Sequence, residues 1–202
     1  MSRYRLKNDL SVGVQLRSGF GTRLPPYFRN IGKRLVKSPK LYFCDTGLAA
    51  FLLGIENEKQ IARDPLRGNL FENLAVAEAL KHRFHHGQKS NLYFYRDSKG
   101  NEVDLLRVQG STFFPIEIKA GMTITRDYFK GLKHFLGVFP DQTPHGGGLV
   151  YGGEEAQQRS DVTVVPLTRI RSLFNDPRGR TQGDGVEILR FQATRAYRPS
   201  SS

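Results

Sequence analysis

Residues 102–120 have the sequence EVDLLRVQGSTFFPIEIKA, in which two apolar runs lie on either side of a Gln-Gly-Ser turn. Turn residues between two runs of strand-forming residues favour a pair of neighbouring β-strands. Because side chains alternate along a strand, Ile116 and Ile118 face one way, and Glu117 and Lys119 face the other. The second strand is therefore expected to pack its isoleucines and to carry a carboxylate beside an ammonium on the opposite face.

The first run of this stretch carries one acid, Asp104, between the apolar residues Val103 and Leu105. If the two strands pair, Asp104 and Glu117 lie next to each other on one face of the sheet. Two carboxylates brought close repel each other, and each prefers to keep its proton. A bound Mg²⁺ or Mn²⁺ ion removes that conflict, because hard cations bind oxygen ligands. We therefore expect a divalent-metal site at these two residues.

The flanking sequence predicts the remaining elements of an α/β domain. Apolar residues at helical spacing, aromatic and β-branched runs, and the turn residues between them divide the chain into alternating elements. Their order is helix, three strands, helix, strand and strand, at residues 66–86, 91–96, 102–108, 112–120, 125–136, 148–152 and 162–165. Short helices are expected over 48–53, capped by Asp45, and over 167–174. Pro115 lacks an N–H, so its strand is expected to begin at Ile116 or to have an unpaired side there.

The net charge of +12 is concentrated at the start of the chain. Residues 1–40 carry ten Lys or Arg and one acid, Asp9, whereas residues 41–175 are nearly neutral. A basic arm of this kind suits a polyanion such as nucleic acid, although a solvated surface without specific meaning is the simpler alternative. The predicted nucleic-acid contacts are Arg29, Lys33, Arg34, Lys37 and Lys40, with Lys130 and Lys133 from the second helix, for which a solvated face is an equal alternative.

Composition excludes several protein classes. No run of 18 apolar residues occurs, so we expect no membrane span, and the first residues lack the apolar stretch of a secretory signal. A single cysteine, Cys44, cannot form a disulfide within the chain. A reducing cytoplasm is the expected location.

Asp104 followed by Glu117-x-Lys119 resembles the PD-(D/E)xK nuclease pattern. The predicted order of elements is similar to that superfamily's α-β-β-β-α-β core, with its mixed central sheet. The resemblance implies that Asp104, Glu117 and the backbone carbonyl of Ile118 hold the metal. It also implies that Glu72, on the first helix, supplements the metal site, and that Lys119 orients or helps to activate the attacking water. The plain alternative is a surface ion pair of little energetic weight.

A narrower resemblance covers residues 24–174. The stretches 25–43, 45–48, 68–73 and 115–121 are similar to the C-terminal region of a large family of prokaryotic AAA-type ATPases. Those proteins have an N-terminal P-loop ATPase, a winged-helix-like joint and a C-terminal nuclease-like domain. No G-x-x-x-x-G-K-[ST] motif occurs here, so the chain is expected not to hydrolyse ATP by itself. It looks like a fragment or truncated relative.

The resemblance divides the chain into four parts: a flexible or truncated lead-in (1–23), a basic remnant of the winged-helix-like joint (24–62), a PD-(D/E)xK nuclease-like domain (63–174) and a loosely ordered tail (175–202). The expected function is Mg²⁺- or Mn²⁺-dependent hydrolysis of phosphodiester bonds in DNA. The alternative is a non-catalytic nucleic-acid-binding or regulatory module of an AAA-type ATPase. A module that binds an acidic protein through its basic arm is a weaker alternative, and a homodimer stays open because related nucleases often pair.

Overall fold

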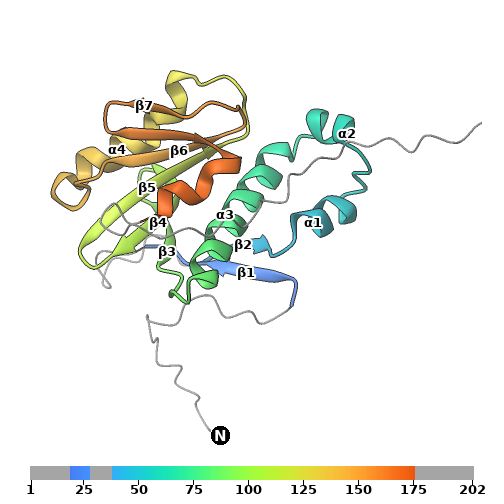
Figure 1. The fold of residues 1–202 in the computed structure, drawn as a ribbon, viewed down its shortest axis with the longest axis horizontal. Helices are drawn as coiled ribbons and strands as arrows, with labels where there is room; N and C mark the ends of the chain where they lie inside the picture. The colour runs from blue at the N-terminus through green and yellow to red at the C-terminus, as the bar shows by residue number, and fades with distance from the viewer. Residues whose placement is uncertain (1–18, 28–37, 176–202) are drawn as a thin grey trace, which may run out of the picture.

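The computed structural model describes residues 19–27 and 38–175 (Figure 1). The strands are β1 (Gly21–Leu24), β2 (Lys40–Phe43), β3 (Leu92–Arg96), β4 (Glu102–Gln109), β5 (Thr112–Lys119), β6 (Gly147–Tyr151), β7 (Gln157–Arg159) and β8 (Val162–Pro166). The α-helices are α1 (Thr46–Leu52), α2 (Glu58–Arg63), α3 (Arg67–His85) and α4 (Lys130–Val138). Three 3₁₀ segments are η1 (Arg126–Phe129), η2 (Pro140–Gln142) and η3 (Leu167–Phe174).

A six-stranded sheet of order β3-β4-β5-β6-β8-β7 forms the centre of the fold. The first three strands form an antiparallel meander, whereas β5, β6 and β8 run parallel to one another. The prediction of an α/β fold with a mixed sheet is therefore confirmed. Pro115 lies inside β5 opposite Leu106, so the expectation that the strand begins only at Ile116 was wrong. The alternative of an unpaired side is confirmed, because pairing of β5 with β6 begins at Ile116.

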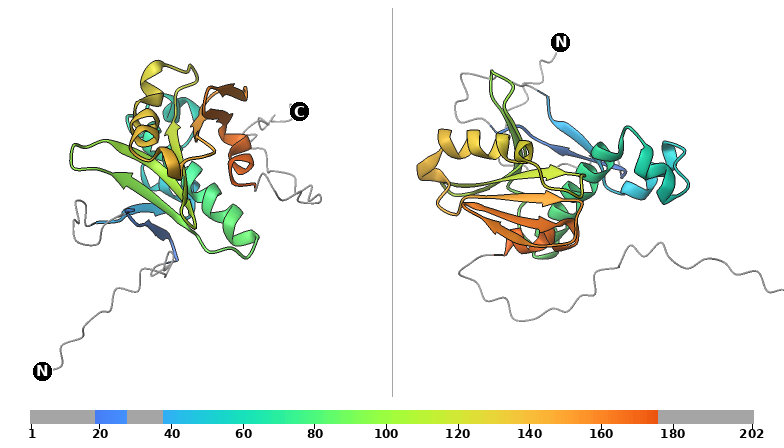
Figure 2. Two further views of the ribbon diagram at one scale, coloured as in Figure 1. Left: turned by 90° about the vertical axis from the view of Figure 1, so that its left-hand side faces the viewer. Right: turned by 90° about the horizontal axis from the view of Figure 1, so that it is seen from above.

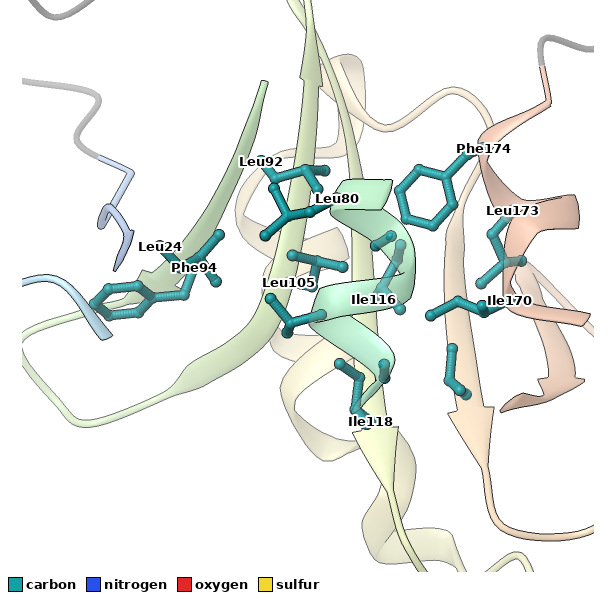
Figure 3. Close-up of a cluster of buried hydrophobic side chains, with 14 of the residues drawn as sticks. Leu24, Leu80, Leu92, Phe94, Leu105, Ile116, Ile118, Ile170, Leu173 and Phe174 are labelled. Atoms are coloured by element: carbon teal, nitrogen blue, oxygen red, sulfur yellow. The ribbon is translucent and has the colours of Figure 1, made fainter. Parts of the chain in front are cut away.

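Helical segments cover both faces of this sheet, as Figure 2 shows from two further directions. α3 and η3 lie on one face, where Leu80, Leu105, Ile116 and Ile170 belong to one buried cluster (Figure 3). α4 lies on the other face, where the fully buried Phe135 packs with aromatic side chains of the sheet. Burial of this apolar area is the main stabilising term of the fold. It also fixes β4 and β5 between two helical layers.

The β1–β2 hairpin lies beside α3 and reaches the edge of the sheet. Its strands pair antiparallel, and the chain that follows β1 joins β3 through Tyr27 N, which donates to Phe94 O at 2.8 Å. Leu24 is buried in the same cluster as the sheet residues. Residues 21–23, which the sequence analysis assigned to a flexible or truncated lead-in, belong to β1 and pair with β2.

Other boundaries follow or correct the sequence expectations. Asp45 caps α1 through Gly47 N and Leu48 N, as predicted. The predicted second helix over 125–136 begins as the 3₁₀ turn η1 and continues as α4 to Val138, and the predicted closing helix is the 3₁₀ segment η3. The sequence did not predict α2 or β7. Residues 1–18, 28–37 and 176–202, which include most of the basic arm and nearly all of the predicted tail, lie outside the described residues.

Candidate functional site

Asp104 lies at the point where β4 and β5 stop pairing regularly. The paired register runs from Gln109 opposite Thr112 to Leu105 opposite Ile116, and Asp104 is the next residue. Its Oδ2 accepts a hydrogen bond of 2.9 Å from the backbone N–H of Ile118. The carboxylate of Asp104 thus accepts a hydrogen bond from the backbone of β5, where a backbone carbonyl of β4 would accept it in a regular ladder. This contact aims the carboxylate along the end of β5.

Glu117 and Lys119 complete a buried group around Asp104. The ammonium nitrogen of Lys119 lies 3.3 Å from Asp104 Oδ2 and 3.5 Å from Glu117 Oε2. The exposed fraction is 5% for Glu117 and 9% for Asp104. The structure therefore brings together the three residues that the sequence placed in one constellation.

The two carboxyl groups titrate as a pair with opposite shifts. Burial and the neighbouring charge of Asp104 raise the pKa of Glu117 to about 9. Burial also acts on Asp104, but the hydrogen bond from Glu117, the charge of Lys119 and the Ile118 N–H hold the pKa of Asp104 below its ordinary value. Burial lowers the pKa of Lys119, yet both carboxyls outweigh it and keep that pKa raised. The opposite shifts favour the protonated form of Glu117 and the ionised form of Asp104.

Gly131 on α4 explains how closely the helix covers this pair. A Cβ atom at that position would overlap the Oε1 atom of Glu117 and the backbone oxygen of Glu102. Glycine in a helix interior costs about 1 kcal/mol relative to alanine, so a close contact is a physical reason for its presence. The backbone of α4 therefore forms one wall around the Glu117 carboxyl.

A second group of charges adjoins Asp104 from the hairpin side. The ammonium nitrogen of Lys40 lies 2.6 Å from Glu102 Oε1, 3.0 Å from Glu72 Oε1 and 4.0 Å from Asp104 Oδ1. Arg96 forms a further ion pair with Glu102. Burial lowers the pKa of Lys40, but the hydrogen bond with Glu102 and the charges of Glu72 and Asp104 leave that pKa raised. Lys40 is therefore a fixed cation among carboxylates.

Hydrogen bonds to α3 hold the hairpin in this position. The hydroxyl of Tyr42 donates to Glu72 Oε1 at 2.5 Å. Phe43 N donates to Asn73 Oδ1 at 2.7 Å, and Asn73 Nδ2 donates to Phe43 O at 3.0 Å. The buried amide of Asn73 thus pairs with the backbone of β2 as a neighbouring strand would.

An open groove of about 520 Å³ lies next to the second group. Its polar end includes Lys40, Glu72 and Glu102, and its walls include apolar side chains of β2 and α1. Asp104, Glu117 and Lys119 are not among its lining residues. The groove therefore borders the Lys40 cluster and not the buried pair Asp104 and Glu117.

The other predicted site residues have different positions. The Ile118 side chain is buried against α3, and its N–H contacts Asp104. Glu72 contacts Lys40 and Tyr42, and is not brought into a group with Glu117. Lys130 is exposed and pairs with Asp127 at 2.6 Å, and Lys133 is exposed. The remaining predicted nucleic-acid contacts, Arg29, Lys33, Arg34 and Lys37, lie outside the described residues.

Several residues of the site were not recognised from the sequence. Glu102 lies two positions before Asp104, and Tyr42 lies two after Lys40, so strand alternation could have grouped each pair on one face. Asn73 and Gly131 gave no such signal, because their contacts join segments far apart in the sequence. Among the residues that the structure describes, no group of three or more His, Cys, Asp or Glu side chains is arranged to hold a metal ion.

A sequence profile described as "Domain of unknown function (DUF4143)" matches residues 67–170, slightly more than half of the chain. The chain belongs to the DUF4143 family. The DUF4143 match begins with α3 and contains Asp104, Glu117 and Lys119. A second profile, "Domain of unknown function (DUF8612)", matches residues 16–59, which carry Lys40. The charged cluster therefore joins residues from two separately defined sequence families.

Two curated relatives share this region with the DUF4143 chain. Uncharacterized protein Rv2008c of Mycobacterium tuberculosis and uncharacterized protein Mb2031c of Mycobacterium bovis are each 34% identical over 149 residues, which is 73% of this chain. The aligned part is 32% of each relative, so the chain spans about a third of their length. No solved structure matches the chain significantly. In the described part of the DUF4143 chain, no helix is long and apolar enough to cross a membrane.

Proposed function

We propose that this chain hydrolyses phosphodiester bonds in DNA with Mg²⁺ or Mn²⁺, at a PD-(D/E)xK-like centre formed by Asp104, Glu117 and Lys119. The observation that carries the proposal is the buried pair Asp104 and Glu117, whose carboxyl oxygens lie 3.3 Å and 3.5 Å from the ammonium nitrogen of Lys119. Perturbed pKa values from burial and a specific charged neighbour are typical of functional sites.

The donor set fits a hard divalent cation. A Mg²⁺ ion is commonly held by one or two carboxylates together with water and substrate phosphate, and Asp104 and Glu117 supply two. Burial and the charge of Asp104 raise the pKa of Glu117, and a divalent ion would relieve the repulsion between these two buried carboxyls. The chemistry that such an ion supplies is polarisation of a phosphoryl oxygen and a lower pKa for the attacking water.

The residues of the chain have separate tasks in this proposal. Asp104 is oriented by the Ile118 N–H, so its carboxylate stays fixed during the reaction. Lys119 keeps its proton because its pKa is raised, and it therefore stabilises the negative charge that builds on the phosphoryl oxygens. The backbone of α4 at Gly131 limits access of water to Glu117.

Cleavage of linear, single-stranded and four-way-junction DNA with Mg²⁺ or Mn²⁺ tests the proposal. Wild type is expected to cut at least one substrate, and Asp104→Ala and Lys119→Ala are expected to lose about 100-fold or more in rate. Lys59→Ala, at an exposed lysine of α2 for which no contact with nucleic acid is predicted, is the matched control and should cut at the wild-type rate. No cleavage by wild type, or equal cleavage by all four proteins, would contradict the proposal.

A second candidate is a non-catalytic nucleic-acid-binding or regulatory module of an AAA-type ATPase. Its specific support is Lys40, which pairs with Asp104 itself and with Glu72 and Glu102, so that part of the negative charge at the site is already balanced. Salt-sensitive DNA binding that is unchanged in Asp104→Ala and Lys119→Ala, with no cleavage, would favour this candidate.

A further inference from the structure

The walls of the groove form an exposed apolar surface between β2, α1 and the start of α3, at the opposite end of the molecule from α4 (Figure 1). Five large apolar residues that line the groove are exposed to solvent, namely Leu41, Phe43, Leu52, Leu53 and Leu66. They are half of the ten exposed large apolar residues in the described ranges of the chain. An apolar patch of this kind with a polar rim is typical of a protein-interaction surface.

These five residues expose enough apolar surface for a dimer contact. Their exposed fractions run from 40% to 72%, so at about 200 Å² for a large apolar residue they present on the order of 500 Å². A standard protein interface covers about 800 Å² on each partner, and about 65% of that area is apolar in homodimers. The groove therefore supplies the apolar share of a standard homodimer contact.

The charge around the groove differs from that of the rest of the chain. Residues 40–73, which include β2, α1, α2 and the first turns of α3, carry four Lys or Arg and five Asp or Glu, a net charge of −1, whereas the whole chain carries +12. Two copies of the chain therefore repel each other least when they meet at this face. At its polar end, Lys40 and Arg96 already pair with Glu72 and Glu102, so a contact that covers these charges leaves each with a partner.

The outer edge of β2 borders the same groove. Cys44 N donates to Phe20 O of the β1 side at 2.9 Å, and the alternation of an antiparallel ladder then points the backbone groups of Leu41 and Phe43 away from β1. Asn73 binds both groups of Phe43. Among the residues that the structure describes, the N–H and C=O of Leu41 have no such partner. Unpaired edge groups beside an apolar surface favour association with another chain.

We propose that this groove is the contact face of a homodimer, and that its occupant is a second copy of the same chain. A two-fold axis places the same patch on both copies, so the apolar walls of one groove cover those of the other. The lining of the groove does not include Asp104, Glu117 or Lys119. The dimer is therefore independent of the proposed cleavage, and it carries two such centres.

Sedimentation velocity of the full-length chain, in the absence of DNA and metal ions, tests the proposal. The sedimenting mass is expected to rise with concentration from that of one 22.9 kDa chain to that of two. Added NaCl should strengthen the association, because it screens the repulsion between two chains of charge +12. A complex bridged by residual nucleic acid would instead weaken as salt is added.

Two substitutions place a carboxylate in the contact on both copies. Leu41→Glu in β2 and Leu52→Glu in α1 are each expected to weaken association by about 100-fold or more, because like charges then face each other in an apolar contact. Both residues are exposed in the single chain, so each variant should fold, and circular dichroism checks this. Met122→Glu, at an exposed residue outside the groove, is the matched control and should associate as wild type does.

The outcomes decide for or against the second copy. Loss of association in both Leu variants, with association kept in Met122→Glu, would support the proposal. A wild-type chain that sediments as a monomer up to about 100 μM would overturn it and leave the groove to a different partner. A dimer that both folded Leu variants retain, or one that dissociates as salt is added, would also overturn it. None of these outcomes bears on the cleavage proposal, because the measurement contains neither DNA nor metal.

Discussion

Two lysines contact Asp104, and they reach it by different routes. Lys119 belongs to the strand next to Asp104, fifteen residues away, and its partner acid Glu117 lies two positions before it. Lys40 belongs to a separate hairpin, and Asn73 and Glu72 of α3 hold that hairpin in place. On the Lys119 side the acids outnumber the cation, so one keeps its proton. On the Lys40 side, Lys40 and Arg96 pair with carboxylates, and these partners keep the pKa of Lys40 raised although burial lowers it.

The difference shows that one carboxylate of β4, Asp104, can lie between two electrostatic environments, one around Lys119 and one around Lys40. On the Lys119 side, the backbone of α4 lies against the Glu117 carboxyl, and two carboxyls surround one ammonium. On the Lys40 side, the ammonium of Lys40 already pairs with the carboxylates. The position of Lys40 depends on the hydrogen bonds that attach the hairpin to α3. Three substitutions, taken from the largest expected effect to the smallest, test this contrast.

Gly131→Ala is expected to destabilise the fold most, because Gly131 of α4 lies against Glu117. The added methyl would overlap Glu117 Oε1 and the backbone oxygen of Glu102, so we expect a loss of roughly 2–3 kcal/mol in the free energy of unfolding. Gly137→Ala is the matched control, because it lies on the same helix with nothing within 4 Å, and should stabilise by about 0.5–1 kcal/mol. Thermal unfolding followed by circular dichroism measures both. Equal shifts in the two variants would refute the close contact.

Asn73→Ala is expected to weaken the attachment of β2, which carries Lys40, to α3. It removes the partners of both backbone groups of Phe43, and leaving such groups unpaired costs about 1–3 kcal/mol. Hydrogen exchange should show faster exchange of the β2 amides while the β4–β5 amides keep their protection. Asn69→Ala, an exposed asparagine of the same helix, should leave both regions unchanged. Uniform loss of protection across both regions would mean that the hairpin is not a separate unit.

Glu117→Gln is expected to have the smallest effect near pH 5, where glutamine resembles the protonated carboxyl, and to change how stability depends on pH. The pKa of Glu117 is raised in the folded chain to about 9, so the folded state holds a proton that the unfolded state releases above its ordinary pKa. Stability from this group is therefore present at low pH and is lost as the pH rises toward 9, with a slope of at most about 1.4 kcal/mol per pH unit. Glutamine does not titrate, so the variant should flatten this slope in urea unfolding between pH 5 and 9. A slope identical to that of wild type would show that Glu117 does not hold the proton.

Much of the fold was predictable because its signals are local. The apolar runs and turn residues of 102–120 predicted β4 and β5, and Asp45 predicted the start of α1. Failures occurred where tertiary pairing overrides local signals. Residues 21–24 have no strand pattern of their own, yet they pair with β2. The short closing helix expected over 167–174 is present, as the 3₁₀ segment η3. The nuclease assignment and the domain limits stay predictions.

The candidate site divides in the same way. The sequence by itself determined that Asp104, Glu117 and Lys119 share one end of a strand pair, because alternation and a short turn place them there. Only the tertiary structure decided which acid keeps its proton, because burial under α4 at Gly131 comes from a distant segment. Only the tertiary structure also took Lys40 out of the basic arm and placed it among carboxylates, because its position depends on the hydrogen bonds between the hairpin and α3.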